Sequence, residues 1–207
     1  PSRSDALPGV RGRHERAERP GAVRPHDPHL EGPARARRRM STTVRPGTRA
    51  DLPRIVAIYN HYVEQSVTTF DTEPVTVASR APWFDGFDGT RHQLFVMTEA
   101  DVVIGYAYSG AFRARAAYDR SVETSIYLAP GAVGRGLGEA LYRRLLAAVD
   151  ESDVHRAYGV ITVPNPASIA LHERLGFTEV GRLTECGRKF DRWHDVAILE
   201  RPAPPRT

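Results

Sequence analysis

The spacing of hydrophobic residues predicts four helices. Between positions 52 and 63, apolar and aromatic side chains recur at every third or fourth position, which places them on one helical face. Thr48 or Asp51 is the expected N-cap, and Pro53 favours Asp51 because proline is tolerated only in the first helical turn. The other helices are expected at residues 75–87, where the pattern is weaker, at 137–148, and at 166–175 behind the capping residue Asn165.

Shorter apolar runs between the helices predict seven strands. They are expected at residues 42–45, 93–99, 103–110, 122–128, 155–163, 178–185 and 193–200. Along the chain, the first strand is followed by a helical pair, then by a meander, then by alternating helices and strands, and finally by two strands. This order predicts an α/β architecture, a twisted mixed sheet with helices on both faces.

The first forty residues have a different composition. They are rich in Pro, Gly, Arg and Ala, hold few large apolar residues and show no periodicity, so they are predicted to form a disordered extension. The folded domain is expected over residues 41–200 and a flexible tail over residues 201–207. Because Met40 lies next to the first predicted strand, we expect it to be the natural start of the protein.

Charge and composition narrow the range of partners. The chain has a formal charge of +4, but residues 1–40 hold ten Arg against five Asp and Glu, which leaves residues 41–207 with a net charge of −1. The predicted domain therefore has no strong electrostatic reason to bind nucleic acid. No apolar run of about eighteen residues predicts a membrane span, and the single Cys186 excludes an intramolecular disulfide and a cysteine-based zinc site. A cytoplasmic protein without a metal fits these features.

A glycine-rich segment joins the strand at residues 122–128 to the helix at residues 137–148. Gly134, Gly136 and Gly138 allow the backbone to approach a ligand closely, and backbone N–H groups at a helix N-terminus favour an anion. The segment therefore fits a pyrophosphate, although its spacing fits a tight turn between a strand and a helix equally well. It differs from the dinucleotide-binding fingerprint, and it lacks the Lys-Ser/Thr pair of a nucleoside triphosphate loop.

Several sequence blocks resemble the GCN5-related N-acetyltransferase (GNAT) family. The family-wide blocks are residues 125–128, 133–138 and 165–177. Within the family, the chain is similar to phosphinothricin and methionine sulfoximine N-acetyltransferases at residues 60–62, 69–74, 113–118, 122–123 and 193–196. The resemblance implies a mostly antiparallel sheet of about seven strands that splays between the strands at 122–128 and 155–163 to admit acetyl-CoA. It also implies a homodimer.

The resemblance further implies how acetyl-CoA is held. Backbone groups of one strand would hold the pantetheine arm and polarise the acetyl carbonyl, amides of the glycine-rich segment would hold the pyrophosphate, and the start of the fourth helix would complete the site. The residues so implied are Ile126, Tyr127, Leu128, Gly134, Arg135, Gly136, Leu137, Gly138, Glu139, Asn165 and Ser168. Val133 departs from the Gln or Arg that is usual in the family, and we expect it to weaken one side-chain contact without abolishing binding.

Two residues are candidates for proton transfer. N-acetylation needs a neutral amine, so a base must accept the proton that most amines carry. Glu123 matches the general base of the family, and a solvated strand carboxylate is the alternative reading of this residue. His172 lies on the inward face of the fourth helix, where a neutral imidazole can accept or relay a proton. A hydrogen-bonded core histidine is the alternative, so its role as base, acid or structural residue stays open.

Four residues are candidates for binding the amine substrate: Phe70, Arg113, Arg115 and Tyr118. Arginine pairs bidentately with a carboxylate or phosphinate, and the two arginines face the same way if their segment is extended. The two aromatic side chains are expected to wall the pocket for the substrate side chain. A solvated basic loop and ordinary aromatic core packing are the alternatives.

Together these features predict an enzyme that transfers the acetyl group directly from acetyl-CoA to an α-amino group. The expected substrate is a small amino-acid analogue such as phosphinothricin or methionine sulfoximine, which would connect the protein with herbicide resistance. Acetylation of another small amine or of a peptide N-terminus is an alternative within enzymes. A non-catalytic acyl-CoA-binding domain is an alternative of a different class.

Overall fold

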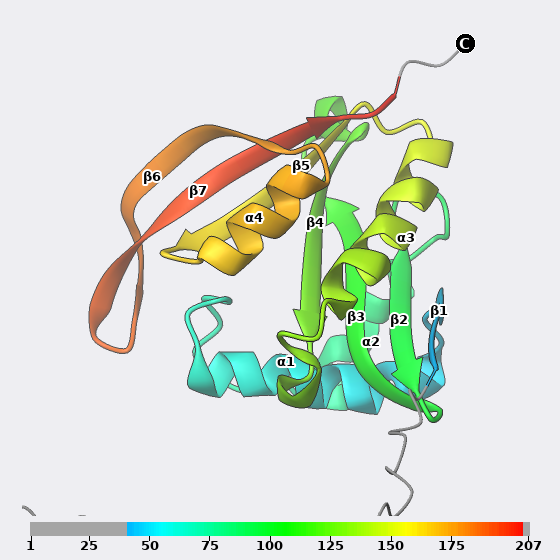
Figure 1. Cartoon of the computed structure of the whole chain (residues 1–207). Helices are drawn as coiled ribbons and strands as arrows, with labels where there is room; N and C mark the ends of the chain where they lie inside the picture. Colours follow the sequence, from blue (N-terminus) through cyan, green and yellow to red (C-terminus); the bar gives the residue numbers. More distant parts are fainter. Residues whose placement is uncertain (1–40, 205–207) are drawn as a thin grey trace, which may run out of the picture. The chain divides into compact units, whose positions relative to one another are not determined.

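A seven-stranded sheet forms the centre of the computed structural model, which describes residues 41–204. The predicted extension over residues 1–40 and the last three residues of the predicted tail lie outside the described residues. The strands lie in the order β1-β2-β3-β4-β5-β7-β6, and every neighbouring pair is antiparallel except β4 and β5 (Figure 1). The strands are β1 (Thr42–Pro46), β2 (Leu94–Glu99), β3 (Val102–Ala111), β4 (Ser121–Leu128), β5 (Arg156–Val163), β6 (Thr178–Lys189) and β7 (Arg192–Pro202). The predicted α/β class and the mixed, mostly antiparallel sheet are confirmed.

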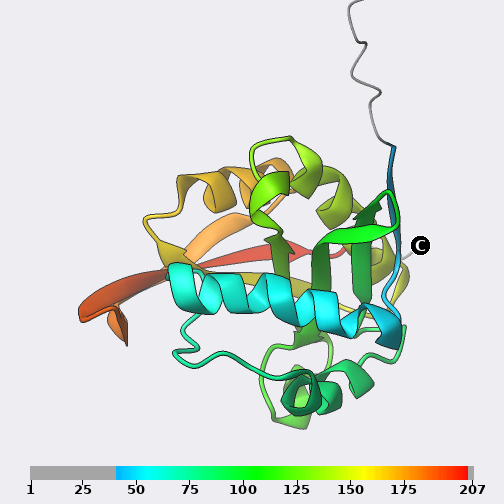
Figure 2. The same cartoon turned by 90° about the horizontal axis from the view of Figure 1, so that it is seen from below.

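Helices cover both faces of the sheet, as predicted. They are α1 (Leu52–Gln65), α2 (Val77–Asp85), α3 (Leu137–Glu151) and α4 (Pro166–Arg174). Figures 1 and 2 show α1 and α2 on one face, with α3 and α4 on the other. Each face has its own core: Ile55, Ile58 and Tyr106 lie in the first, and Leu141, Leu145 and Phe177 lie in the second. Alternate residues of β4 therefore point into different environments.

The last two strands extend beyond their predicted ends. Their hairpin turns at Phe190 and Asp191, which both have a left-handed φ, 49° and 57°. Phe190 is not a typical turn residue, so the sequence pattern does not predict how close to the turn the strands continue. At the other end, β7 includes Arg201, whose guanidinium donates two hydrogen bonds of 2.7 and 2.6 Å to Asp150 of α3. The predicted start of the tail at residue 201 is therefore wrong, since the strand runs through Pro202.

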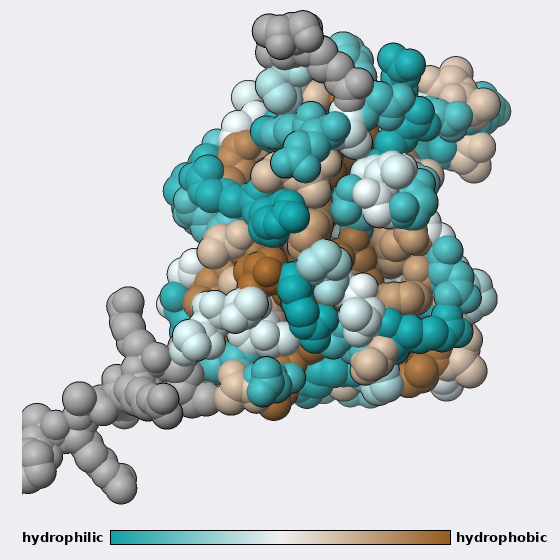
Figure 3. All heavy atoms as spheres, turned by 90° about the vertical axis from the view of Figure 1, so that its right-hand side faces the viewer, coloured by the Kyte–Doolittle hydropathy of each residue, from teal (hydrophilic) through white to brown (hydrophobic). Residues whose placement is uncertain are grey.

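The surface on the side of β1 is mixed in polarity. Hydrophilic and hydrophobic residues are interspersed there, and no single apolar area dominates the view (Figure 3). Among residues 41–204, no helix is long and apolar enough to cross a membrane. Within the same residues, no group of three or more His, Cys, Asp and Glu side chains is arranged to hold a metal ion.

The start of α1 is secured by Asp51, one of the two predicted caps. The carboxylate of Asp51 accepts hydrogen bonds from the backbone N–H of Thr48 at 2.7 Å and from Arg45 of β1 at 2.7 Å. Asp51 is buried, while the side chain of Arg45 remains 39% exposed. The Arg45 hydrogen bond lowers the pKa of Asp51 from its usual 3.8 to about 2. The folded state therefore favours the ionised form of this carboxylate.

Replacing Asp51 with Asn should lower the free energy of unfolding at pH 7 by about 2 kcal/mol, the value of a pKa depressed by nearly two units. Because the pKa is lower in the folded protein, this stabilisation is present above pH 4 and is lost as the pH falls toward 2. Urea unfolding of both proteins between pH 2 and pH 7 measures the difference. The exposed Glu151, replaced by Gln, is the control and should change little. If the two proteins differ by the same free energy of unfolding across this pH range, the ionised carboxylate of Asp51 is not the source of the stabilisation.

Candidate functional site

The parallel pairing of β4 with β5 is short, and the functional site begins where it stops. Only Ser121, Val122 and Glu123 pair with β5, opposite Arg156 to Tyr158. Beyond Glu123, β4 stays paired with β3, and β5 stays paired with β7. A small cavity of about 40 Å³ separates the two strands there, and it is lined from both sides by residues 124–127 and 160–162. We call this cavity the crevice.

A larger cavity of about 340 Å³ opens beside the glycine-rich segment. Gly134 and Gly136 have left-handed φ values of 76° and 74°, which glycine adopts without strain, and Gly136 is the N-cap of α3. The positive end of the helix dipole is therefore turned toward this cavity, which suits an anionic group. We call it the loop cavity. The predicted cofactor residues that line it are Ile126, Leu128, Gly134, Gly136, Leu137, Gly138, Glu139, Asn165 and Ser168.

Two predicted cofactor residues lie elsewhere. Arg135 points to Glu99 at the end of β2, with N–O distances of 2.5 and 3.2 Å, and does not line the loop cavity. Tyr127 lines the crevice and the opposite face of the sheet, because alternate residues of β4 face opposite sides. Both side chains point away from the loop cavity. The contacts with acetyl-CoA that are expected of these two residues are made by their backbone groups.

The loop cavity also has lining residues that the sequence interpretation missed. They are Tyr62, Thr68, Ala167, Leu171 and Arg174, whereas Val133, already noted as a departure from the family, lines this cavity as well. The hydroxyl of Tyr62 donates a 2.6 Å hydrogen bond to the carbonyl of Leu128, which ties α1 to the end of β4. The spacing of 167, 171 and 174 places these three on one helical face, and Leu171 lies about one turn after Ser168, which is the signal that could have identified them.

Glu123 faces a third cavity, of about 250 Å³, on the α1 side of the sheet. Its walls are Tyr59, Thr68, Thr69, Phe70, Tyr108, Ser125, Tyr127, Val160, Thr162 and Val196. Removal from water raises the pKa of Glu123, and the nearby positive charge of Arg113 opposes this rise in part. A carboxylate with a raised pKa in a mainly uncharged cavity is a stronger proton acceptor than one on an open strand. We call this the Glu123 cavity.

His172 is buried in the wall of the crevice, with 3% of its surface exposed. Its Nδ1 lies 2.8 Å from the carbonyl oxygen of Ser168, and its Nε2 lies 2.9 Å from the hydroxyl of Tyr142 on α3. Burial lowers the pKa of His172, which favours the neutral ring. The predicted inward orientation on α4 is confirmed by this placement, while its chemical role is a separate question.

Phe70 belongs to a connection, residues 66–76, that is held from two sides. Tyr59 of α1 hydrogen-bonds to Thr69 at 2.8 Å and to Asp71 at 2.7 Å. From β6, the buried Nζ of Lys189, the sole lysine of the chain, donates a 2.8 Å hydrogen bond to the carbonyl of Thr69. The ring of Phe70 therefore has a defined position as one wall of the Glu123 cavity.

The remaining substrate candidates lie on the β3–β4 connection. The segment is bent and not extended, with a 3-10 turn at Ala116–Tyr118, so the alternation expected for Arg113 and Arg115 is absent. Arg113 and Tyr118 line a separate cavity of about 110 Å³, and Arg115 is exposed. Arg113 nevertheless acts electrostatically on Glu123, since its positive charge opposes the rise in the pKa of that carboxylate.

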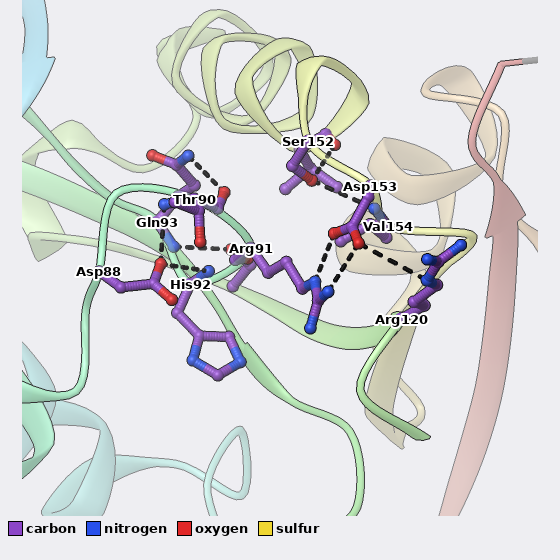
Figure 4. Close-up of polar contacts among 11 residues, drawn as sticks. Asp88, Thr90, Arg91, His92, Gln93, Arg120, Ser152, Asp153 and Val154 are labelled. Carbon is purple, nitrogen blue, oxygen red and sulfur yellow. Dashed lines mark hydrogen bonds and ion pairs between the residues drawn. The ribbon is translucent and has the colours of Figure 1, made fainter. Parts of the chain in front are cut away.

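Both ends of this connection are fixed. At its start, the ring of Phe112 stacks on Tyr158 of β5 with centroids 4.1 Å apart. At its end, Asp153, which follows α3, lies 3.5 Å from Arg120 and 2.6 Å from Arg91 (Figure 4). Figure 4 shows Arg91 and Arg120 approaching the Asp153 carboxylate from two different segments. The connection is therefore anchored close to the site rather than free.

The three cavities adjoin one another. The loop cavity and the crevice share Thr68, Ile126, Asn165 and Ser168, and the crevice and the Glu123 cavity share Thr68, Ser125, Tyr127, Val160 and Thr162. A long ligand with an anionic end at α3 can therefore reach through the sheet toward Glu123. This arrangement brings a second reactant, seated at Glu123, close to the inner end of the first.

Comparisons with known proteins agree with this geometry. The model of the acetyltransferase (GNAT) domain matches residues 44–198. The chain is 50% identical to the phosphinothricin N-acetyltransferase of Streptomyces coelicolor over 163 residues, 77% of this chain and 95% of that protein. It is 35% identical over 167 residues to the L-methionine sulfoximine/L-methionine sulfone acetyltransferase of Pseudomonas paraeruginosa, covering 80% and 97%. The crystal structure of a phosphinothricin acetyltransferase from Sinorhizobium meliloti in complex with AcCoA aligns with a TM-score of 0.76 at 39% identity, covering 79% of this chain and 89% of that one.

Proposed function

Because the chain belongs to the GNAT acetyltransferase family and is an acetyl-CoA-dependent N-acetyltransferase, we propose that Glu123 is its general base and that its acceptor is the α-amino group of a small amino-acid analogue. The observation that carries this proposal is the continuity of the Glu123 cavity with the loop cavity through the crevice. Acetyl-CoA is the acetyl donor, and the residues of the loop cavity fit its shape and charge.

In this proposal, acetyl-CoA lies with its pyrophosphate at the start of α3. The backbone amides of residues 134–139 hold the pyrophosphate, and Asn165 and Ser168 contact the cofactor beside the crevice. The pantetheine arm follows residues 126–128, where the missing β5 partner leaves β4 backbone groups free to pair with its amides. A backbone N–H near Tyr127 or Leu128 stabilises the oxyanion of the tetrahedral intermediate.

The chemistry of Glu123 follows from its burial. It accepts the surplus proton of the substrate ammonium group, which leaves a neutral amine to attack the acetyl carbonyl. The transfer is direct. The single cysteine, Cys186, is exposed on β6 and lines none of the three cavities, so the proposal includes no acyl-enzyme.

The substrate assignment rests on the names of the relatives and on the charges around Glu123. Phosphinothricin and methionine sulfoximine both carry an α-amino group and an acidic or strongly polar head. We propose that Phe70 packs against the substrate side chain and that Arg113, Arg115 and Tyr118 bind its anionic groups from the β3–β4 connection. Acetylation removes the positive charge of the amine, so expression of the protein would confer resistance to the herbicide phosphinothricin.

A panel of amines tests this proposal. Purified protein is mixed with acetyl-CoA and each amine, and release of free thiol is followed over time. Turnover with phosphinothricin or methionine sulfoximine, and little with their N-methylated or deaminated analogues, is the expected result. If no α-amino acid or analogue in the panel is acetylated, the substrate assignment fails.

Peptide N-termini are a second candidate for the acceptor. A crystal structure described as a ribosomal-protein-alanine N-acetyltransferase from Brucella melitensis aligns with a TM-score of 0.75 at 35% identity, covering 77% of this chain and 99% of that one. A competition assay between an amino acid and a peptide that begins with the same residue distinguishes the two acceptors. The small volume of the Glu123 cavity favours the free amino acid.

We further propose a cytoplasmic homodimer that binds neither membranes nor nucleic acid. Hydrophobic side chains are exposed on the β6–β7 hairpin, at Val180, Leu183, Phe190 and Trp193, with 47% to 58% of their surfaces accessible. Such a group on neighbouring strands is typical of a surface that another chain covers.

Replacing Leu183 and Trp193 together with Ser should shift the mass measured by light scattering from dimer to monomer. An unchanged mass would place the interface elsewhere, and the same change at the exposed Val102 of β3 is the control.

A further inference from the structure

A chain of buried hydroxyl groups connects β4 with His172. The Oγ1 of Thr124 lies 2.6 Å from the hydroxyl of Tyr142, and that hydroxyl lies 2.9 Å from Nε2 of His172. Thr124, Tyr142 and His172 are each at most 3% exposed, and they come from β4, α3 and α4. Thr124 and His172 both line the crevice, so the chain begins and ends beside the place where the reactants meet.

The donor and acceptor of each hydrogen bond in this chain follow from the contact between His172 and the carbonyl of Ser168. The carbonyl of Ser168 can only accept, so Nδ1 of His172 carries a proton. In the neutral ring, Nε2 must then accept the proton of Tyr142. Because Tyr142 has only one proton, the 2.6 Å contact with Thr124 requires Thr124 to donate. In this state all protons of the chain point toward His172.

The hydrogen bonds of this chain can also all point in the opposite direction, away from His172. If His172 gains a proton at Nε2, it donates to Tyr142, and Tyr142 in turn donates to Thr124. The Thr124 proton then has a ready acceptor, the carbonyl oxygen of Tyr158 on β5, at 3.0 Å. Burial raises the pKa of Tyr142, so this hydroxyl stays protonated in both states and only changes the direction in which it donates. The charged groups that act on Tyr142 are Glu123 and Arg201, which have opposite signs.

We propose that Thr124 and Tyr142 form a reversible proton relay between the crevice and His172. The proposal rests on the acetyltransferase function stated above and assigns the second proton of the reaction. Glu123 takes the first proton, which makes the amine neutral. When the amine attacks the thioester, its nitrogen becomes positively charged and must lose a second proton, while the departing coenzyme A sulfur must gain one.

The relay balances these two needs. As the N–C bond forms, the second amine proton passes to Oγ1 of Thr124, the Thr124 proton passes to Tyr142, and the Tyr142 proton passes to Nε2 of His172. When the C–S bond breaks, the same shifts run backward and return one proton to the crevice, where the thiolate takes it. In this sequence Thr124 contacts the reacting amine, and Tyr142 acts through its hydrogen bonds to Thr124 and to Nε2 of His172.

Replacement of Thr124 with Val, which has nearly the same volume and no hydroxyl, tests the first step of the relay. We expect kcat to fall by about 100-fold, a usual value for loss of one proton transfer, with the KM values of acetyl-CoA and amine unchanged. Thr124→Ser keeps the hydroxyl and should restore most of kcat. Thr98→Val, at a buried threonine on β2, is the matched control for removing a hydroxyl and should leave kcat unchanged.

A merely structural role would give a different pattern. If Thr124→Val lowers the melting temperature but keeps kcat, or if Thr124→Ser is as slow as Thr124→Val, the relay is wrong. Tyr142→Phe interrupts the chain one step later and should match the kcat of Thr124→Val, which provides the test if the valine variant does not fold.

Nitrogen NMR of the imidazole in the wild-type protein should find the neutral His172 protonated at Nδ1, and protonation at Nε2 would overturn the assigned direction. A wild-type protein that acetylates no amine would refute the proposed function itself.

Discussion

Replacing Glu123 with Gln should lower kcat roughly 100- to 10,000-fold and leave the KM for acetyl-CoA almost unchanged. Gln has the same shape, but its amide cannot accept the proton of the substrate ammonium group. Glu123 lies outside the loop cavity, so binding of the cofactor should not depend on its charge. Steady-state kinetics with either substrate varied separates the two parameters.

The pH dependence of the same variant provides an independent measurement. Because burial raises the pKa of Glu123, wild-type kcat should fall as the pH drops through this raised value, which lies above the usual 4.5. The variant should lack this fall. Glu64→Gln, at an exposed glutamate of α1, is the matched control and should keep both kcat and its pH profile. A Glu123→Gln protein with kcat within about twofold of wild type would rule out the general-base role.

Replacing Gly187 with Ala should reduce kcat/KM for the amine by about 100-fold, because it moves the wall of the Glu123 cavity. A Cβ at position 187 would lie 2.2 and 2.4 Å from two ring carbons of Phe70, which no packed structure tolerates. Lys189 and Tyr59 hold Thr69, the neighbour of Phe70, so the ring has to turn while its backbone stays in place. Misplacement of a substrate-positioning group by about 1 Å is enough for a loss of this size.

The chain offers a closely matched control for this change. Gly181 lies on the same strand, and a Cβ there would meet no atom within 4 Å. Gly181→Ala should therefore leave kcat/KM for the amine unchanged, and both variants should keep the KM for acetyl-CoA. The order of preference among amines of different side-chain length should change for Gly187→Ala alone. Equal kinetics of the two variants would show that Phe70 does not shape the substrate pocket.

Most of the fold could be predicted from the sequence because its helices and strands have strong local signals. The apolar spacing between positions 52 and 63 and the Asn165-Pro166 start are properties of neighbouring residues, and the structure has α1 and α4 there. The β6–β7 hairpin is different. Its turn places Phe190 and Asp191 in a left-handed conformation. Phe190 is not a typical turn residue, so the sequence pattern predicts strands that are shorter than those in the structure.

Residue spacing alone indicates the site only where its residues lie close together in the sequence, whereas Asn165 and Ser168 followed from the family resemblance. Glycines 134, 136 and 138 form a recognisable segment, and they line the loop cavity. The contact of Phe70 with Gly187 joins residues more than a hundred positions apart, and nothing in either local sequence indicates it. The Tyr142 hydroxyl belongs to an ordinary amphipathic helix, so only its position beside His172 gives it a possible chemical role.

The early end of the β4–β5 pairing also bears on aggregation. Past Glu123, β4 has an edge inside the molecule, and edges with unpaired backbone groups are where strands of other chains attach. Here the edge is sheltered, because Thr68 from the connection after α1 and Ser168 from α4 both lie at the crevice. With a volume of only about 40 Å³, the crevice has no room for a strand from another molecule. The fold thus keeps a reactive sheet edge available to its cofactor without offering it to neighbouring protein molecules.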